Sequence, residues 1–391
     1  MKLFEREILI INRLFKELLI VLVEHLPIFI ILILYLGYGF YIEYKLDNYH
    51  IIHLRFAMAQ FYSLLIAYNL CIFFIGQFGI RVFKNNIDGI YPKLQDIINN
   101  YFSINRFAGF LLIYILLPFI VSLFESLKKS IPTILPFCCD VLFMKLDYIL
   151  HFNHHPWILF SPILTNTISI RLIDFLYITW FFLLNIITFW LSWSNRRKLR
   201  MQFFMTNLLI LFIIGNLLAT VFSSAGPCYY ENVTGLTQQN PYKPLMDKLH
   251  SIENNNPPID KPYHKIDNSP LIALELQDNL WDNYINKGKG YCEYISAMPS
   301  VHVAFATLIA LTVSRVNLYL GVIFWIYWVV IQIGSVILGW HYAVDGYFST
   351  ILTIGLWKIS GYFNKWFWRE LPEKIQIQIL RPNLRWLQNK S

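Results

Sequence analysis

The sequence predicts an all-α protein that crosses a membrane about eight times. The chain is 56% hydrophobic and 17% aromatic, only 14% of its 391 residues are charged, and apolar windows of about 18 or more residues recur along it. A closed barrel is the other structure that spans a bilayer, but barrel strands alternate apolar and polar residues, whereas these windows are apolar throughout. The windows therefore indicate transmembrane helices.

The expected spans follow one another through most of the chain. They occupy residues 26–43, 57–80, 107–124, 172–193, 203–222, 299–316, 318–340 and 345–362. Residues 125–171, between the third and fourth spans, mix Lys and Asp with aromatic side chains, which is typical of amphipathic segments on a membrane interface. Residues 227–296 are the most polar part of the chain, and we expect a surface loop there that can cover a site.

Basic residues gather in alternate loops, which sets the expected orientation. They are Lys2, Arg6, Arg13 and Lys16, then Arg81, Lys84, Lys93 and Arg106, then Arg196, Arg197, Lys198 and Arg200, then Arg315 and the tail from Lys365. Because basic loops stay on the cytoplasmic side, both termini are expected there and residues 223–298 outside. The net charge of +8 then reflects topology and anionic lipid headgroups, not nucleic-acid binding. We expect a bacterial inner membrane with a periplasmic site, which would be lumenal in a eukaryote.

Two short motifs, each at the edge of an apolar span, carry the chemistry. Ala297-Met298-Pro299-Ser300-Val301-His302 begins one span, and His341-Tyr342-Ala343-Val344-Asp345 precedes another. The predicted topology brings both to the outer face. One imidazole can attack phosphorus, a carboxylate can orient it and a second imidazole can protonate the departing oxygen. The motifs therefore predict phosphoryl transfer through a covalent phosphohistidine, with no cofactor.

Local geometry suggests how each motif works. Pro299 is favoured in a first helical turn, which would leave the amides of Ser300, Val301 and His302 free at the positive end of a helix dipole. His341 and Asp345 are four residues apart, so a helix beginning here would stack them on one face. Asp345 would then accept the Nδ1 proton of His341 and leave Nε2 aimed at phosphorus.

Two other interpretations use the same residues. A single histidine at a membrane interface is often only an interfacial polar side chain, although two histidines and a carboxylate brought to one face favour function. Two histidines and an aspartate also suit a metal ion, but no third strong ligand lies nearby in the sequence. We therefore expect no metal site.

The motifs resemble the type 2 phosphatidic acid phosphatase superfamily, and within it the branch that contains yeast-type inositol phosphorylceramide synthases. The resemblance rests on Pro-Ser-x-His at 299–302, His-Tyr-x-x-Asp at 341–345, Gly226-Pro227-Cys228-Tyr229-Tyr230 and, more weakly, Asp140 with Asp147. It covers about the last five spans and implies a six-helix catalytic core. By this resemblance His341 is the nucleophile, Asp345 its orienting partner and His302 the general acid. Substrate contacts are expected from Pro299, Ser300, Val301, Tyr342, Gly226, Pro227, Tyr229 and Asp147.

The chain also departs from the phosphatase pattern. The outer side has no Lys-x6-Arg-Pro motif, and Gly334-Ser335 stands where the phosphatases carry Ser-Arg before the histidine. The synthase-like branch also lacks these basic groups, which favours it. Candidates to supply positive charge instead, each also readable as a plain interfacial or loop residue, are Lys145, Arg171, Lys287 and Lys289.

The expected organisation has three parts: a two-helix membrane region over 1–106, a catalytic membrane domain over 107–362 with outer loop 223–298, and a cytoplasmic interfacial tail over 363–391. Cys228 and Cys292 bracket the outer loop, where an oxidising compartment would let them pair.

We expect a lipid phosphotransferase that moves a phospho-headgroup, such as phosphoinositol, from a phospholipid donor to a lipid alcohol such as ceramide. Two alternatives stay open: a phosphatase that uses water as acceptor on phosphatidate or polyprenyl phosphates, and a non-catalytic lipid transporter or binding protein.

Overall fold

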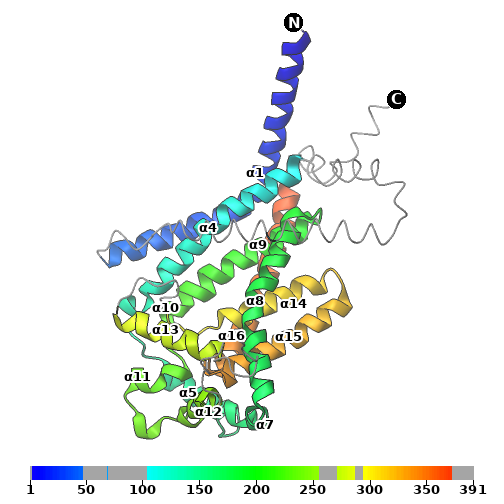
Figure 1. The fold of residues 1–391 in the computed structure, drawn as a ribbon. Helices are drawn as coiled ribbons and strands as arrows, with labels where there is room; N and C mark the ends of the chain where they lie inside the picture. The colour runs from blue at the N-terminus through cyan, green and yellow to red at the C-terminus, as the bar shows by residue number, and fades with distance from the viewer. Residues whose placement is uncertain (1, 47–67, 69–103, 255–270, 287–293, 372–391) are drawn as a thin grey trace, which may run out of the picture.

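The fold is known from a computed structural model, which describes residues 2–46, 68, 104–254, 271–286 and 294–371 (Figure 1). All regular structure in these residues is helical, with no strand among them. The helices are α1 (Lys2–Lys45), α4 (Ile104–Ile134), α5 (Asp140–Leu150), α6 (Pro156–Leu159), α7 (Ser161–Leu164), α8 (Thr167–Trp193), α9 (Arg197–Leu209), η2 (Ile210–Leu218), α10 (Ala219–Val221), η3 (Pro227–Tyr229), α11 (Tyr230–Thr234), η4 (Thr237–Gln239), α12 (Lys243–Asn254), α13 (Ile272–Asn286), α14 (Val301–Ser314), α15 (Leu318–Ile337) and α16 (Ala343–Glu370).

Five helical segments of the described part are long and apolar enough to cross a membrane. They are Leu18–Lys45, Arg106–Ile134, Thr167–Trp193, Arg197–Val221 and Leu318–Ile337, and each overlaps a predicted span. Two further predicted spans are helices, the 14-residue α14 and the 28-residue α16. The predicted span at 57–80 lies outside the described residues except for residue 68. The prediction of an all-α polytopic membrane protein is confirmed.

Helix α14 is central to the packing. It contacts α8, α9, η2, α15 and α16. All residues from Val303 to Ala310 are buried, and alanines at 304, 306 and 310 let neighbouring helices approach closely. Because α14 carries His302 in its first turn, the surrounding helices fix the position of that side chain.

The approach of α15 to α8 depends on a glycine. A Cβ atom added to Gly334 would lie 3.0 Å from Cγ2 of Ile173 and 3.2 Å from Cδ2 of Tyr177. Contacts this close leave little room for a side chain on Gly334. The glycine of the Gly334-Ser335 pair therefore serves helix packing.

Helix α1 is attached to the rest of the bundle by packing and by charge. It packs against α4 and α9, and the buried carboxylate of Glu24 pairs with Arg200 and, at 3.7 Å, with Arg197 of α9. A buried carboxylate needs such partners to offset its desolvation. Arg197 and Arg200, two members of the basic cluster that was predicted to be cytoplasmic, thus form ion pairs inside the bundle.

The polar segments gather at one end of the bundle. In Figure 1, α5, α7, α11 and α12 lie at the lower end of the view, opposite the start of α1. The region predicted as a surface loop, 227–296, is largely helical where it is described, because apolar positions such as Leu245, Leu249 and Leu274 are buried. Gln277 of α13 donates to the carbonyl of Leu338 at 2.9 Å, which ties this region to the turn that precedes His341.

Candidate active site

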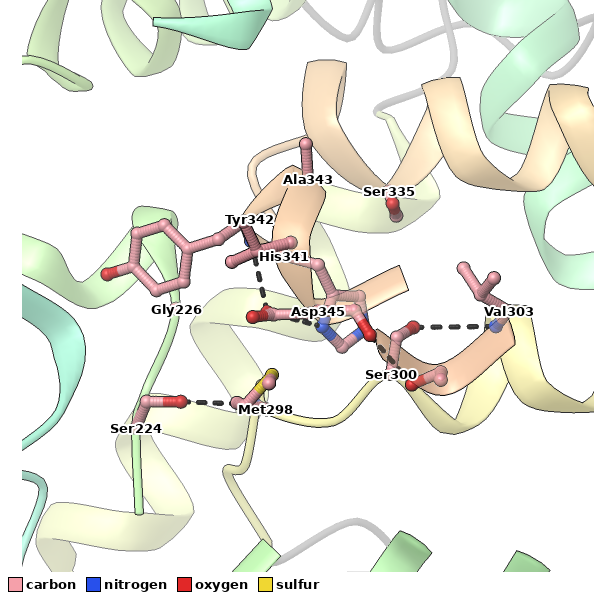
Figure 2. A network of polar contacts seen from close by, with 12 residues as sticks. Ser224, Gly226, Met298, Ser300, Val303, Ser335, His341, Tyr342, Ala343 and Asp345 are labelled. Atoms are coloured by element: carbon pink, nitrogen blue, oxygen red, sulfur yellow. Dashed lines mark hydrogen bonds and ion pairs between the residues drawn. The ribbon is translucent and has the colours of Figure 1, made fainter. Parts of the chain in front are cut away.

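His341 and Asp345 form a buried pair at the start of α16. Nδ1 of His341 lies 3.3 Å from Oδ2 of Asp345, with 6% and 0% of the two side chains exposed. Oδ2 also accepts the backbone amide of Tyr342 at 3.1 Å (Figure 2). The carboxylate thus holds the imidazole by Nδ1, the pairing that the sequence predicts.

The backbone around this pair differs from the expected helical stack. Helix α16 begins at Ala343 with Tyr342 as its N-cap, so His341 lies before the helix and not on its face. Asp345 is the third helical residue and reaches back to the N-cap, as an acidic side chain does in a capping box. The amide of His341 donates to the carbonyl of Ser335 at 3.0 Å. The pairing was predicted correctly, but a helix cap produces it.

His302 lies beside His341 in the first turn of α14. The centroids of the two imidazole rings are 5.9 Å apart, with 61° between the ring planes. Tyr177 of α8 stacks on His302 with a centroid distance of 4.9 Å, and Trp180 meets its ring edge-on at 5.1 Å. Sequence analysis missed both aromatic residues, since nothing in the sequence links α8 to His302.

The residues before His302 cap α14. Ser300 is the N-cap, and its Oγ accepts the amide of Val303 at 3.4 Å. The expectation that Pro299 lies in the first turn, with the amide of Ser300 free, is wrong: Pro299 precedes the cap, and that amide donates to the carbonyl of Asp345 at 3.4 Å. Ser300 therefore joins the start of α14 to the start of α16, because a fully buried backbone donor needs a partner.

Asp140 and Asp147 of α5 are buried and bound to backbone amides. Asp147 accepts from Ala343 at 2.7 Å and from Val344 at 2.9 Å, so it caps the start of α16. Asp140 accepts from the amides of Ala225 and Gly226 and from the hydroxyl of Tyr342 at 2.8 Å. Burial raises the pKa of Asp147 to about 7, against the opposing effect of its two amide donors. The two carboxylates hold the loops that carry the site.

The Gly226-Pro227 segment packs directly behind His341. Gly226 has a φ of 102°, and a Cβ there would lie 2.6 Å from the carbonyl oxygen of Trp340. Only glycine fits both the conformation and the contact. The amide of Cys228 donates to Gly339 at 2.9 Å, which fixes the same turn. The predicted pairing of Cys228 with Cys292 involves a cysteine outside the described residues.

A cavity of about 340 Å³ opens onto both histidines. It is mainly apolar and aromatic and extends between α4, α8 and η2, as the side chains of Leu117, Leu184 and Leu211 show. Of the substrate contacts expected from the sequence, Val301 and Tyr229 line it. The others, Pro299, Ser300, Tyr342, Gly226, Pro227 and Asp147, do not line it. A lipid chain matches such walls, because they offer apolar contact and few hydrogen-bond partners.

The positive charge of the cavity comes from a residue that sequence analysis did not select. Lys128 of α4 lines the cavity, with 5% of its side chain exposed. Among the expected sources of charge, Lys145 is exposed, Arg171 does not line the cavity, and Lys287 and Lys289 lie outside the described residues. Only the fold brings Lys128 to the histidines, because more than 170 residues separate it from His302.

The electrostatics favour a neutral imidazole at His341. Burial, together with the positive charge of Lys128, lowers the pKa of His341 to about 3, from an ordinary value of 6.5. A neutral imidazole has the free lone pair that attack on phosphorus requires. The arrangement can therefore supply an oriented nucleophile, with a second imidazole at His302 for proton transfer.

Comparison with protein families assigns this region. Residues 142–359, more than half of the chain, match the PAP2 superfamily. No curated protein and no solved structure matches the chain. The match begins in α5 and ends in α16, so it includes His302, His341 and Asp345 and excludes α1 and α4. The chain is a membrane protein with a lipid phosphatase or phosphotransferase type of site, and it belongs to the PAP2 superfamily, the type 2 phosphatidic acid phosphatases and their relatives.

Proposed function

We propose that the protein is a membrane lipid phosphotransferase that works through a phosphohistidine at His341. The observation that carries the proposal is the group formed by Asp345, His341 and His302, whose two histidines line an apolar cavity. Asp345 holds Nδ1, His341 is buried and neutral, and the ring of His302 lies 5.9 Å from that of His341. This is the arrangement that covalent catalysis with a separate general acid needs.

The proposed reaction has two steps. Nε2 of His341 attacks phosphorus of a phospholipid, the bond from phosphorus to the diacylglycerol oxygen breaks, and protonated His302 gives that oxygen its proton and becomes neutral. The hydroxyl of a lipid alcohol such as ceramide then attacks the phosphohistidine, His302 takes the hydroxyl proton, and the bond between nitrogen and phosphorus breaks. Asp345 stabilises the imidazolium character of His341 in both steps.

Two observations favour a lipid acceptor over water. The cavity is mainly apolar, which disfavours water beside the phosphohistidine. Ser335, at the position of the phosphatase arginine, is fully buried and donates to the carbonyl of Gln332 at 2.7 Å, so an arginine there would have no room. Both features fit the inositol phosphorylceramide synthase-like branch, with phosphatidylinositol as donor and ceramide or diacylglycerol as acceptor.

We also propose the orientation that the basic loops predict, with both termini cytoplasmic and the histidines at the periplasmic or lumenal face. The catalytic domain is residues 107–362, the region 1–106 is an N-terminal membrane addition, and 363–391 is an interfacial tail. Single-cysteine labelling at exposed Lys248 and Arg315, from the two sides of sealed vesicles, tests the orientation. Labelling of both positions from one side would contradict it.

The test of function supplies labelled phosphatidylinositol or phosphatidate to the purified protein, with and without ceramide or diacylglycerol, against a His341→Ala control. A labelled inositol phospholipid that forms only with acceptor supports the transferase. Free phosphate from phosphatidate, unaffected by acceptor, would make the protein a phosphatase. Binding of lipid without any product would favour a non-catalytic role.

A further inference from the structure

Lys128 is a buried cation that forms no ion pair with a carboxylate in the described part of the chain. Its Nζ lies 5.5 Å from the ring centroid of Phe124 and 5.9 Å from that of Tyr294. In the described part of the chain, the charge therefore meets these two aromatic rings. Cation–π contacts offset only part of the cost of burying an ammonium group. A buried lysine on a cavity wall with no carboxylate bound to it points to an anion supplied by a ligand.

The position of Lys128 identifies which part of the ligand it meets. Lys128, His302 and His341 line one cavity, and after burial the charge of Lys128 is the main cause that lowers the pKa of His341. The ammonium group therefore acts on the place where phosphorus would meet Nε2. Lysine is a common phosphate-binding residue because it is a compact point charge.

The number of cations in the cavity limits the charge of the ligand. Lys128 is the one lysine or arginine among the described residues that line it. Glu125 and Asp174 also line it, and Asp174 accepts the amides of Ile272 and Ala273 at the start of α13. These two carboxyl groups can only add negative charge to the lining, so Lys128 is its single positive group. A phosphate monoester carries about −1.5 to −2 at pH 7, whereas a diester carries a single negative charge.

We propose that Lys128 binds a non-bridging oxygen of the transferred phosphoryl group, and that this single cation fits the site to phosphodiester lipids and against phosphate monoesters. The inference rests on the proposed function and deepens it. When the bond between Nε2 and phosphorus forms and the bond to the leaving oxygen breaks, the non-bridging oxygens keep one negative charge, which Lys128 neutralises throughout. Electrostatic stabilisation of this kind is worth about 10²–10³-fold in rate for one donor.

This cation comes from outside the region that matches the PAP2 superfamily. Helix α4 ends at Ile134, and the match begins at residue 142. The chain has Ser335 on α15, where the phosphatase pattern has an arginine, and the one cation of the described lining is on α4. The positive charge of the site is therefore that of one residue, and it lies outside the matched region.

The test separates binding from turnover. In a His341→Ala background, which prevents chemistry, the affinities for phosphatidylinositol and phosphatidate are measured in detergent with Lys128, Lys128→Met and Lys128→Arg. Lys128→Met should weaken phosphatidylinositol binding at least tenfold, while Lys128→Arg should stay within a few-fold of the parent. Lys129→Met, at the exposed neighbouring position, is the matched control and should leave binding unchanged.

Turnover supplies the second readout. With His341 intact, Lys128→Met should lower kcat/KM for phosphatidylinositol about 100-fold or more without lowering the melting temperature, because it removes an unbalanced buried charge. Diester binding that ignores Lys128→Met, or tighter wild-type binding of phosphatidate, would overturn the inference. Lys128-dependent diester binding by a protein without turnover would support this inference and refute the proposed phosphotransferase.

Discussion

Oδ2 of Asp345 accepts from Nδ1 of His341 at 3.3 Å and from the amide of Tyr342 at 3.1 Å, so one oxygen orients the imidazole and caps helix α16. The other oxygen, Oδ1, is buried and has no hydrogen-bond partner among the described residues. The carboxylate of Asp345 therefore binds the start of α16 and the imidazole of His341 at the same time.

Asp345→Asn tests this double role. An asparagine oxygen can still cap α16, but it carries no charge to stabilise the imidazolium and its amide can favour the wrong tautomer of His341. We expect kcat to fall about 10⁴-fold with a nearly unchanged melting temperature. A loss of expression with normal specific activity in the surviving protein would show that Asp345 is only structural.

Trp180→Leu should impair proton transfer more than attack on phosphorus. Trp180 meets the edge of His302 and stacks on Phe305, so its removal frees the imidazole to rotate. We expect activity to fall about tenfold or more with donors that have poor leaving groups, and much less with an activated donor, because only the former need a general acid. Phe182→Leu, at an exposed position on the same helix, is the control. Equal losses with both donors would contradict this role for Trp180.

Gly226→Ala should displace the His341 turn. The added Cβ would strain a backbone at φ 102° and meet the Trp340 carbonyl oxygen at 2.6 Å, and we expect a loss of about 2 kcal/mol or more in stability together with lost activity. Gly235→Ala is the matched control, because Gly235 has a φ of 68° and no atom within 4 Å of the added Cβ. It should cost about 1 kcal/mol and leave activity intact. Similar effects of the two substitutions would refute the close contact.

Asp147 makes stability depend on pH. Burial raises its pKa to about 7 from 3.8, so the folded state binds this proton more tightly than the unfolded state does. The contribution of this group is full below about pH 4 and is lost as the pH rises to 7. The melting temperature of the wild type should therefore fall, relative to Asp147→Asn, between pH 4 and pH 7. Parallel curves for the two proteins would show that Asp147 does not titrate in this range.

Sequence patterns predicted the parts of this protein that depend on local information. Spans follow from apolar windows, and the pairing of His341 with Asp345 follows from residues close together in the chain. The cap geometry at Tyr342 was missed because i,i+4 spacing does not show where a helix begins. The polar region 227–296 was expected to be a loop, since its overall polarity hides the apolar positions that α12 and α13 bury.

Residues brought to the site from distant helices could not be found this way. Tyr177 and Trp180 look like ordinary span residues in the sequence, and Lys128 falls in the polar segment 125–171 that was expected to lie on the membrane interface. No spacing rule relates any of the three to His302. Asp140 and Asp147 were noticed only through a resemblance, and the structure shows that they act on backbone amides. Tertiary packing alone assigns these contacts.

We expect a phosphohistidine to form at His341, and this covalent intermediate can be trapped directly. The purified His302→Ala variant is incubated with an activated phosphodiester lipid labelled on phosphorus and then quenched in alkali, where a phosphohistidine survives, and the labelled peptide is sequenced by mass spectrometry. We expect an acid-labile label on His341 that forms slowly and is absent from the His302→Ala, His341→Ala double variant. A label that persists without His341, or full turnover by His341→Ala, would contradict it.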